Sequence, residues 1–288
     1  MTPGSIADAA WNSGAFQGLE LIQDSLQVQI SHVEARTPGE QEEALRAYAR
    51  QGYALIFGHG FEFQGAAERV SAEFPLAIFI ITSGEQLRGN VAPMIFRLGE
   101  ATYLAGLVAG GVTRSNVIGF VGGIELPPIR EAADAWFAGA RASNPRVTTR
   151  STYLNTFDDV AAGREAAVAL LRAGADILTH NADQAALGLF QAVKEAPSVY
   201  VFGANLDQTD LAPERVLGSA VIDLPRAFLA VAREVQSGTF TPHVESFGLA
   251  SGVVRYEPNP ALLHLLSSDI QARVSAARDS IIANDRAP

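Results

Sequence analysis

Short apolar runs alternate with amphipathic segments along the whole chain. Continuous apolar, β-branched runs are typical of strands buried in a parallel sheet, whereas apolar residues at a period of 3.6 indicate amphipathic helices. Strands are predicted at residues 28–33, 53–57, 77–82, 90–96, 117–121, 147–154, 175–179, 198–203 and 216–221. Helices are predicted at residues 15–26, 39–51, 64–74, 99–111, 129–141, 159–173, 184–194, 224–236 and within 259–283, with an extended segment at 247–254. This alternation indicates a mostly parallel α/β sheet, formed twice.

The composition is that of a globular chain, and it argues against some classes of binding partner. Of the 288 residues, 48% are hydrophobic and 18% are charged, which suffices for a core in each of two lobes. The net charge of -10 and the pI near 5.0 argue against nucleic acid or an anionic membrane as the main partner. Lys194 is the only lysine and cysteine is absent. Disulfides, thiol nucleophiles and cysteine-bound metals are therefore excluded, and lysine Schiff-base chemistry nearly so.

The sequence lacks the signals of a membrane-spanning or leader segment. No apolar run approaches the roughly 18 residues that a membrane helix needs. Met1-Thr2-Pro3-Gly4 leads into a turn rather than into the apolar region of a signal peptide. If the protein is exported, this sequence therefore corresponds to its trimmed mature form.

The predicted strand at 117–121 and the Gly122-Gly123 pair after it indicate where a ligand binds, because open α/β sheets bind ligands where their strands end. The other strand-end loops carry aromatic, amide, hydroxyl and carboxylate side chains. Such side chains suit a pocket that stacks a flat ring and hydrogen-bonds its rim. The candidates are Asp8, Trp11, Asn12, His59, Phe61, Thr82, Ser83, Gly122, Gly123, Glu125, Asn155, Phe157, His180, Asn181, Asp183, Asn205, Asp207 and Gln208.

Several of these side chains also have a purely structural interpretation. Trp11 either stacks on a ligand or packs at the base of its loop, and Asn12 either contacts a ligand or caps the helix. His59 and His180 contact a ligand or are simply buried, and they are too isolated to form a metal site. Asp8 is expected to cap a helix, as are Asp158 and Asp159.

No sequence motif supports an enzyme. The chain has no Gly-x-Ser-x-Gly, Walker or Gly-x-Gly-x-x-Gly motif after a strand, and no set of nucleophile, base and orienting residue can be named. We therefore expect a binding protein that has no cofactor or metal.

The sequence resembles one known family over nearly its whole length. The segment from Gly4-Ser5-Ile6 to Trp11-Asn12 is similar to the opening loop of the basic membrane protein (Bmp) family of substrate-binding lipoproteins. Further matches are Gly60-Phe61, Asn90-Val91-Ala92, Tyr103 to Gly106, Gly119 to Gly123, Phe157-Asp158-Asp159, Gly188 to Ala192, Asp207-Gln208 and Val216-Leu217.

The resemblance implies a type I periplasmic-binding-protein fold, in which two doubly wound α/β lobes joined by three crossings enclose a ligand. The implied lobes are residues 1–114 with 223–248, and residues 115–222 with 249–288. The implied protein feeds an ABC importer, has a permease as its partner and binds a purine base, a nucleoside or a relative. It would lie in the periplasm or on the cell surface and touch the membrane only through a lipid anchor outside this sequence. Trp11 would stack on the base, Asn12 would lie beside it, and an aromatic between Tyr153 and Phe157 would supply the opposite face.

The sequence also departs from the family pattern. Asn205 stands where the family has a ribose-binding Asp, Ile222 falls near a family Lys, and Thr82 or Ser83 replaces another Asp. These replacements remove charged groups that would bind the ribose, and hydrogen bonds to charged groups contribute roughly 1.5–3 kcal/mol each. A neutral heterocycle is therefore a better candidate ligand than the usual nucleoside. The family also has an apolar strand before Gly4, where this sequence has Met1-Thr2-Pro3. Either the sequence begins inside the usual domain or another segment replaces that strand.

Two alternatives remain open at this level. The first is a cytoplasmic ligand-sensing regulator with the same fold. The second is a nucleoside-processing enzyme, which would need a cluster of carboxylates at a strand end.

Overall fold

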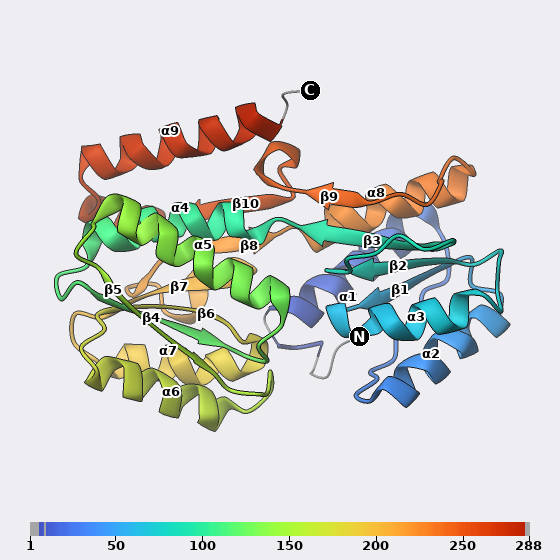
Figure 1. The fold of residues 1–288 in the computed structure, drawn as a ribbon, viewed down its shortest axis with the longest axis horizontal. Coiled ribbons are helices and arrows are strands. Elements are labelled where there is room, and N and C mark those ends of the chain that lie inside the picture. The colour runs from blue at the N-terminus through green and yellow to red at the C-terminus, as the bar shows by residue number, and fades with distance from the viewer. Residues whose placement is uncertain (1–5, 9, 286–288) are drawn as a thin grey trace. The chain divides into compact units, whose positions relative to one another are not determined.

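The chain divides into two compact α/β units in a computed structural model that describes residues 6–8 and 10–285 (Figure 1). The first unit comprises residues 12–96 and 223–247 with the segment up to Asp8. The second comprises residues 97–222 and 248–285 with residues 10 and 11. Apart from this short segment before α1, the described chain passes from one unit to the other at 96/97, 222/223 and 247/248. The Gly4-Ser5 part of the motif and the residues before it lie outside the described residues.

The first unit is built on a parallel sheet with the strand order β1-β2-β3-β9. Its elements are α1 (Trp11–Leu26), α2 (Pro38–Arg50), β1 (Leu55–His59), α3 (Gln64–Ser71), β2 (Ile78–Thr82), β3 (Val91–Phe96), α8 (Leu224–Ser237) and β9 (Glu245–Phe247). Leu45 of α2, Val70 of α3 and Phe63 of the 3₁₀ turn before α3 are buried against Ile56 and Phe79 of the sheet. The other face packs on α8, where the rings of Phe57 and Phe228 stack at 4.1 Å.

The second unit has a larger sheet with the order β10-β8-β7-β6-β4-β5, in which β10 alone is antiparallel. Its elements are α4 (Leu98–Val112), β4 (Val117–Gly122), α5 (Pro127–Ser143), β5 (Thr148–Tyr153), α6 (Val160–Arg172), β6 (Ile177–Asn181), α7 (Ala186–Glu195), β7 (Tyr200–Asn205), β8 (Val216–Ile222), β10 (Val254–Pro258) and α9 (Ser268–Asp285). The neighbours of β4 along the sheet are β5 on one side and β6 on the other.

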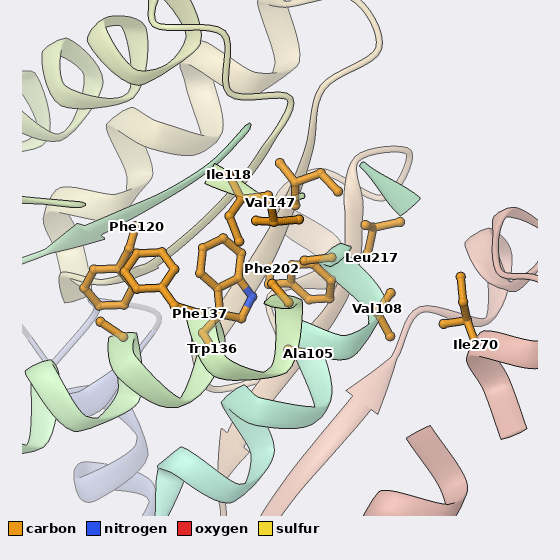
Figure 2. Close-up of a cluster of buried hydrophobic side chains, with 14 of the residues drawn as sticks. Ala105, Val108, Ile118, Phe120, Trp136, Phe137, Val147, Phe202, Leu217 and Ile270 are labelled. Carbon is orange, nitrogen blue, oxygen red and sulfur yellow. The ribbon is translucent and has the colours of Figure 1, made fainter. Parts of the chain in front are cut away.

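Helices cover both faces of this second sheet. On one face, α4 and α5 bury a cluster in which Trp136 contacts Phe137 and faces Ile118, Phe120 and Phe202 of the strands (Figure 2). On the other face, α6 and α7 pack their own cluster against Val121, Leu178 and Val201. Because β4, β6, β7 and β8 are buried on both faces, their sequences are nearly continuous apolar runs, which is why the sequence pattern identifies them. The edge strand β5 is instead polar and partly or fully exposed along its length.

Local sequence signals set several helix boundaries. Thr37 and Glu40 form a capping box at the start of α2, with Pro38 in its first turn. Asp159 accepts a hydrogen bond from the backbone of Ala162 and caps α6, as predicted. Gly238 ends α8 in the left-handed conformation, with φ at 71°.

The structure places α4 in the second unit, whereas the sequence interpretation assigned it to the first lobe. The physical reason is close packing on α5. A Cβ atom at Gly106 or Gly110 would collide with the carbonyl oxygen of Trp136 or Ala140, and one at Gly139 would collide with that of Tyr103. Small residues at these positions let the two helix backbones approach, so the first crossing lies at 96/97 and not near 114.

One predicted strand is absent from the structure. The predicted strands from residue 53 onward agree with the observed ones to within two residues, but residues 28–33 form no strand. Val28 and Val33 are exposed, and no described strand pairs with this segment. The segment 247–254 is also not continuously extended, since a 3₁₀ turn at Leu249–Ser251 separates β9 from β10.

Candidate ligand-binding site

Three polar side chains meet where β6 and β7 end in the second unit. β6 ends at Asn181 and β7 at Asn205, and both strands deliver their last residue to the same edge of the parallel sheet. The Asn205 amide Nδ2 donates to Asp183 Oδ1 at 3.1 Å and lies 3.4 Å from Asn181 Oδ1. All three side chains are more than nine-tenths buried. Buried amides and carboxylates held in one place can recognise a polar ligand through directed hydrogen bonds.

The backbone at this edge adopts unusual conformations. Asn205 has φ at 69°, Asn155 at 58° and Asp183 at 46°, all in the left-handed region. Positive φ is uncommon for residues other than glycine, although asparagine and aspartate adopt it more readily than most, and such residues are found often at ligand-binding sites. The conformation turns each chain segment sharply after its strand, which holds the side chains at the edge.

His180 lies one residue before this group and is neutral. Gln208 Oε1 accepts a hydrogen bond from the backbone N–H of Ala204 at 2.9 Å and lies 2.8 Å from His180 Nε2. Because this oxygen only accepts, Nε2 carries the imidazole proton and Nδ1 is an acceptor. Nδ1 is buried without a hydrogen-bond partner among the described residues. Burial lowers the pKa of His180 to about 4, so the ring is uncharged at neutral pH.

The Gly122-Gly123 pair is explained by the aromatic rings beside it. A Cβ atom at Gly122 would collide with the ring of Tyr153, and one at Gly123 with the ring of Phe157. Phe157 belongs to the buried cluster under α5, and Tyr153 packs against that cluster while remaining partly exposed. The sequence analysis predicted that a ligand lies close to the backbone of Gly122 and Gly123. In the structure, the rings of Tyr153 and Phe157 occupy that space.

The expected carboxylates of the second unit have different surroundings. Glu125 is exposed and forms an ion pair with Arg130 at 3.0 Å. Asp207 accepts hydrogen bonds from the backbone and the hydroxyl of Thr209 and so fixes the turn after β7. Burial, and then the charges of Glu125 and Asp134, raise the pKa of Tyr153. The Tyr153 phenol therefore remains protonated at neutral pH and can donate a hydrogen bond.

The first unit brings together His59 and Thr82 at the ends of β1 and β2. Thr82 Oγ1 accepts from the backbone N–H of Gly60 at 2.8 Å, and it lies 3.0 Å from His59 Nδ1, to which it can donate. Both side chains are buried. Ser83 follows directly with φ at 57°, and the partly exposed Phe61 begins the turn after β1.

The start of α1 carries the other three candidates. The Asp8 carboxylate accepts from the backbone N–H groups of Asn12 and Ser13 at 2.8 and 3.0 Å, which confirms the predicted capping role. Trp11 and Asn12 occupy the first helical positions and are buried. Trp11 is 9% exposed, so little of its ring is available before a ligand binds.

Sequence reasoning missed Glu62, which follows Phe61 in the turn after β1. Burial raises the pKa of its carboxyl group. Its position in a strand-end loop was the signal that could have identified it. Within residues 6–8 and 10–285, no group of three or more His, Asp or Glu side chains is arranged to hold a metal ion. No helix in that same part of the chain is long and apolar enough to cross a membrane.

The chain is similar to substrate-binding proteins of ABC transporters. The family model described as ABC transporter substrate-binding protein PnrA-like (Bmp) matches residues 1–286. Basic membrane protein A of Borreliella afzelii is 30% identical over 267 residues, which are 90% of this chain and 82% of that protein. A putative ABC transporter glucose-binding protein of Haloferax volcanii is 26% identical over 284 residues, covering 97% of this chain and 70% of that protein.

Solved structures share the fold. An ABC transporter solute-binding protein from Aeropyrum pernix K1 has a TM-score of 0.90 at 22% identity, over 98% of this chain and 90% of that one. A transcriptional activator of the comK gene from Bacillus halodurans has a TM-score of 0.82 at 21% identity, over 96% of each chain. Because the family model spans nearly the entire sequence, the chain belongs to the Bmp family of PnrA-like ABC transporter substrate-binding proteins.

Proposed function

We propose that this protein is the solute-binding component of an ABC-type importer and that its ligand is a small, neutral heterocycle such as a purine base, a nucleoside or a relative. It acts in the periplasm or on the cell surface and delivers the ligand to a permease. The observation that carries the proposal is the buried group formed by Asn181, Asp183 and Asn205 where parallel strands end.

The polar side chains at this edge favour a ligand without a phosphate. Lys194, the only lysine, lies in the last turn of α7, about 12 Å along the helix from its first residue. A net charge of -10 also raises the cost of bringing an anion to the protein. Asn205 both donates and accepts, so it can bind a carbonyl or a ring nitrogen as well as a hydroxyl group.

Further candidate residues belong to the proposed binding set. Trp11 is proposed to stack on the flat face of the ligand, because a base stacked on an aromatic ring gains roughly 1–3 kcal/mol. Asn12, His59, Phe61 and Ser83 are proposed to contact its rim. The remaining candidates are proposed to lie next to the ligand in addition to the structural roles described above. They are Asp8, Gly123, Glu125, Tyr153, Asn155, Phe157 and Asp207.

A thermal-shift panel tests the ligand class. Purine bases, nucleosides, nucleoside monophosphates and glucose are added separately to the purified protein. A base or nucleoside should raise the unfolding temperature, since a ligand that binds only the folded state stabilises it. Stabilisation by monophosphates, but not by bases or nucleosides, would contradict the proposal.

Calorimetry on two variants then tests the site. Asn181→Ala should weaken binding of the identified ligand about tenfold, the loss expected from removing roughly one buried hydrogen bond. Asn144→Ala is the matched control, because Asn144 bonds to Asn116 at the opposite edge of the same sheet. If both variants bind the ligand with equal affinity, Asn181 does not contribute to the binding site.

A cytoplasmic ligand-sensing regulator is the second candidate function. It is favoured by the structural similarity to the comK activator of Bacillus halodurans. Cell fractionation separates the two: recovery of the native protein with the cytoplasm would support the regulator, and recovery from the periplasm or cell surface would support the importer component.

A further inference from the structure

Gln208 lies in the turn after β7 and connects three strands of the second unit. Its side-chain oxygen Oε1 accepts a hydrogen bond from the backbone N–H of Ala204 in β7 at 2.9 Å and one from His180 Nε2 in β6 at 2.8 Å. Its backbone N–H donates to Ser219 Oγ of β8 at 3.1 Å. Gln208 is buried, so these bonds are not in competition with bulk water and hold its side chain in one place.

The bond to Ala204 lies where the pairing of β7 with β6 would otherwise continue. The backbone N–H of Tyr200 donates to the carbonyl of Asp176, directly before β6. Alternate residues of a strand direct their backbone groups to the same side, so the N–H groups of Phe202 and Ala204 also point toward β6. The pairing of β7 with β6 ends at Phe202. At Ala204, the side-chain oxygen of Gln208 therefore takes the place of a carbonyl of β6.

Gly203 makes room for this arrangement. A Cβ atom at Gly203 would lie 2.9 Å from Gln208 Cβ and 3.0 Å from Gln208 Oε1. It would also lie 2.5 Å from Ser219 Oγ, on the strand that pairs with Gly203. The Gln208 side chain thus lies directly against the backbone of β7, in space that only glycine leaves open.

The bridge precedes the buried polar group by one residue on each strand. His180 is followed by Asn181, and Ala204 is followed by Asn205. Gln208 therefore holds β6 and β7 at a fixed separation just before their last residues. The distance of 3.4 Å between Asn205 Nδ2 and Asn181 Oδ1 depends on that separation. Binding groups recognise a ligand well only when such supporting contacts hold them in the productive geometry.

We propose that Gln208 is a positioning residue of the binding site: its side-chain oxygen sets the separation of the ends of β6 and β7, and with it the geometry in which Asn181 and Asn205 meet a ligand. The proposal rests on the proposed function, because the geometry matters for binding only if these two amides contact the ligand. Oε1 has two lone pairs, and Ala204 and His180 engage both of them. This oxygen therefore acts through the asparagines and not by direct contact.

Two-dimensional NMR of the ¹⁵N-labelled protein tests the positioning without a ligand. Gln208→Met keeps the length of the side chain but has no oxygen. It should shift the side-chain amide signals of Asn205 and speed the hydrogen exchange of the Ala204 amide at least about tenfold. Gln208→Glu keeps an acceptor oxygen at the same reach and should retain the wild-type signals. Unshifted Asn205 signals in Gln208→Met, or an equal shift in Gln208→Glu, would overturn the proposal.

Gln271→Met is the matched control. Gln271 also bonds to the backbone through its side chain, donating to the carbonyl of Leu266 at 3.0 Å, but it lies in α9. Its replacement should change neither the Asn205 signals nor the exchange of Ala204. If Gln208→Met does not fold, Gly203→Ala takes its place, because the added methyl group displaces the Gln208 side chain. Unshifted Asn205 signals in that variant would likewise overturn the proposal.

Calorimetry with adenine and adenosine, titrated separately, distinguishes the positioning from the proposed function. Gln208→Met should bind either compound about tenfold or more weakly than the wild type, whereas Gln208→Glu and Gln271→Met should bind nearly as well as the wild type. Shifted Asn205 signals with unchanged affinity, or with no binding to any of the proteins, would support the positioning and contradict the proposed function. Weaker binding with unshifted signals would overturn the positioning and assign Gln208 to direct contact with the ligand.

Discussion

At the scale of single residues, the buried imidazole of His180 should make stability depend on pH. Its pKa is about 4 in the folded protein and 6.5 in the unfolded chain. The unfolded state therefore binds more protons between these values. The contribution of the neutral His180 to the free energy of unfolding is complete above pH 6.5 and falls as the pH drops toward 4. It amounts to about 3 kcal/mol in all.

The test compares denaturant unfolding of the wild-type protein and His180→Gln at pH 7.5 and pH 4.5. The wild-type protein should lose about 2–3 kcal/mol more than the variant over this interval. His264→Gln, which removes an exposed imidazole in the second unit, is the control and should behave like the wild type. Identical pH dependence of all three proteins would show that His180 does not contribute.

The Asn205 amide should be needed for stability as well as for binding. Asn205→Asp would replace a donor to Asp183 Oδ1 by a second carboxylate in a buried site. We expect a loss of at least about 1–3 kcal/mol in unfolding free energy at pH 7.5, because a buried acceptor loses its partner and gains a like charge. Urea unfolding measures this loss.

Asn155→Asp is the matched control for that experiment. Asn155 has the same left-handed conformation but is exposed, so its replacement should change stability by no more than about 0.5 kcal/mol. A similar loss in both variants would attribute the effect to the backbone. If Asn205→Asp remains folded, its ligand preference should shift toward ribosides.

Capping residues were the most predictable single residues. Asp8, Asp159 and Gly238 act as their types and positions indicate, because capping depends on a few neighbouring atoms. The hydrogen bond of Asn205 to Asp183 was not predictable, since its partner is 22 positions away and is oriented by the turn after another strand.

At the scale of secondary-structure elements, the contact between α4 and α5 depends on its glycines. Gly106→Ala would push a methyl group into the Trp136 carbonyl and should lower the unfolding free energy by about 1–3 kcal/mol or more. Chemical denaturation measures the change. Gly39→Ala in α2 is the control, because no atom lies near its Cβ position and alanine favours helix. Its stability should be unchanged or higher by up to about 1 kcal/mol.

The buried strands and most helices could be predicted because their sequence period matches their burial on both faces. Residues 28–33 could not, because a strand forms only when a neighbour accepts its hydrogen bonds, and no described strand pairs with it. The assignment of α4 also depended on distant contacts, since its small residues fit α5 and not the sheet that precedes it.

At the scale of the whole molecule, the chain passes between its units at 96/97, 222/223 and 247/248, apart from the short segment before α1. If residues of both units contact one ligand, binding should reduce the average separation of the units through small backbone changes at these points. Small-angle scattering should then give a smaller radius of gyration with saturating ligand. Superimposable profiles with and without ligand would contradict this expectation.

The candidate site was less predictable than the fold. The sequence identified which loops follow strands, and the structure places Asn181, Asp183 and Asn205 together as that rule implies. It did not reveal that the Gly122-Gly123 pair accommodates Tyr153 and Phe157, because this depends on how two rings pack. Ligand identity depends on such local geometry in the same way.

The pairing of β3 with β9 also determines when the protein can fold during synthesis. Met94 of β3 pairs with Glu245, 151 positions later, and Gly111 of α4 packs on Ile270. At a translation rate of about 5–20 residues per second, β3 waits roughly 8–30 s for its partner. Neither sheet can be completed while the last fifth of the chain is missing. The nascent chain therefore exposes one edge of β3 and the part of α4 that packs on Ile270 until translation is nearly finished.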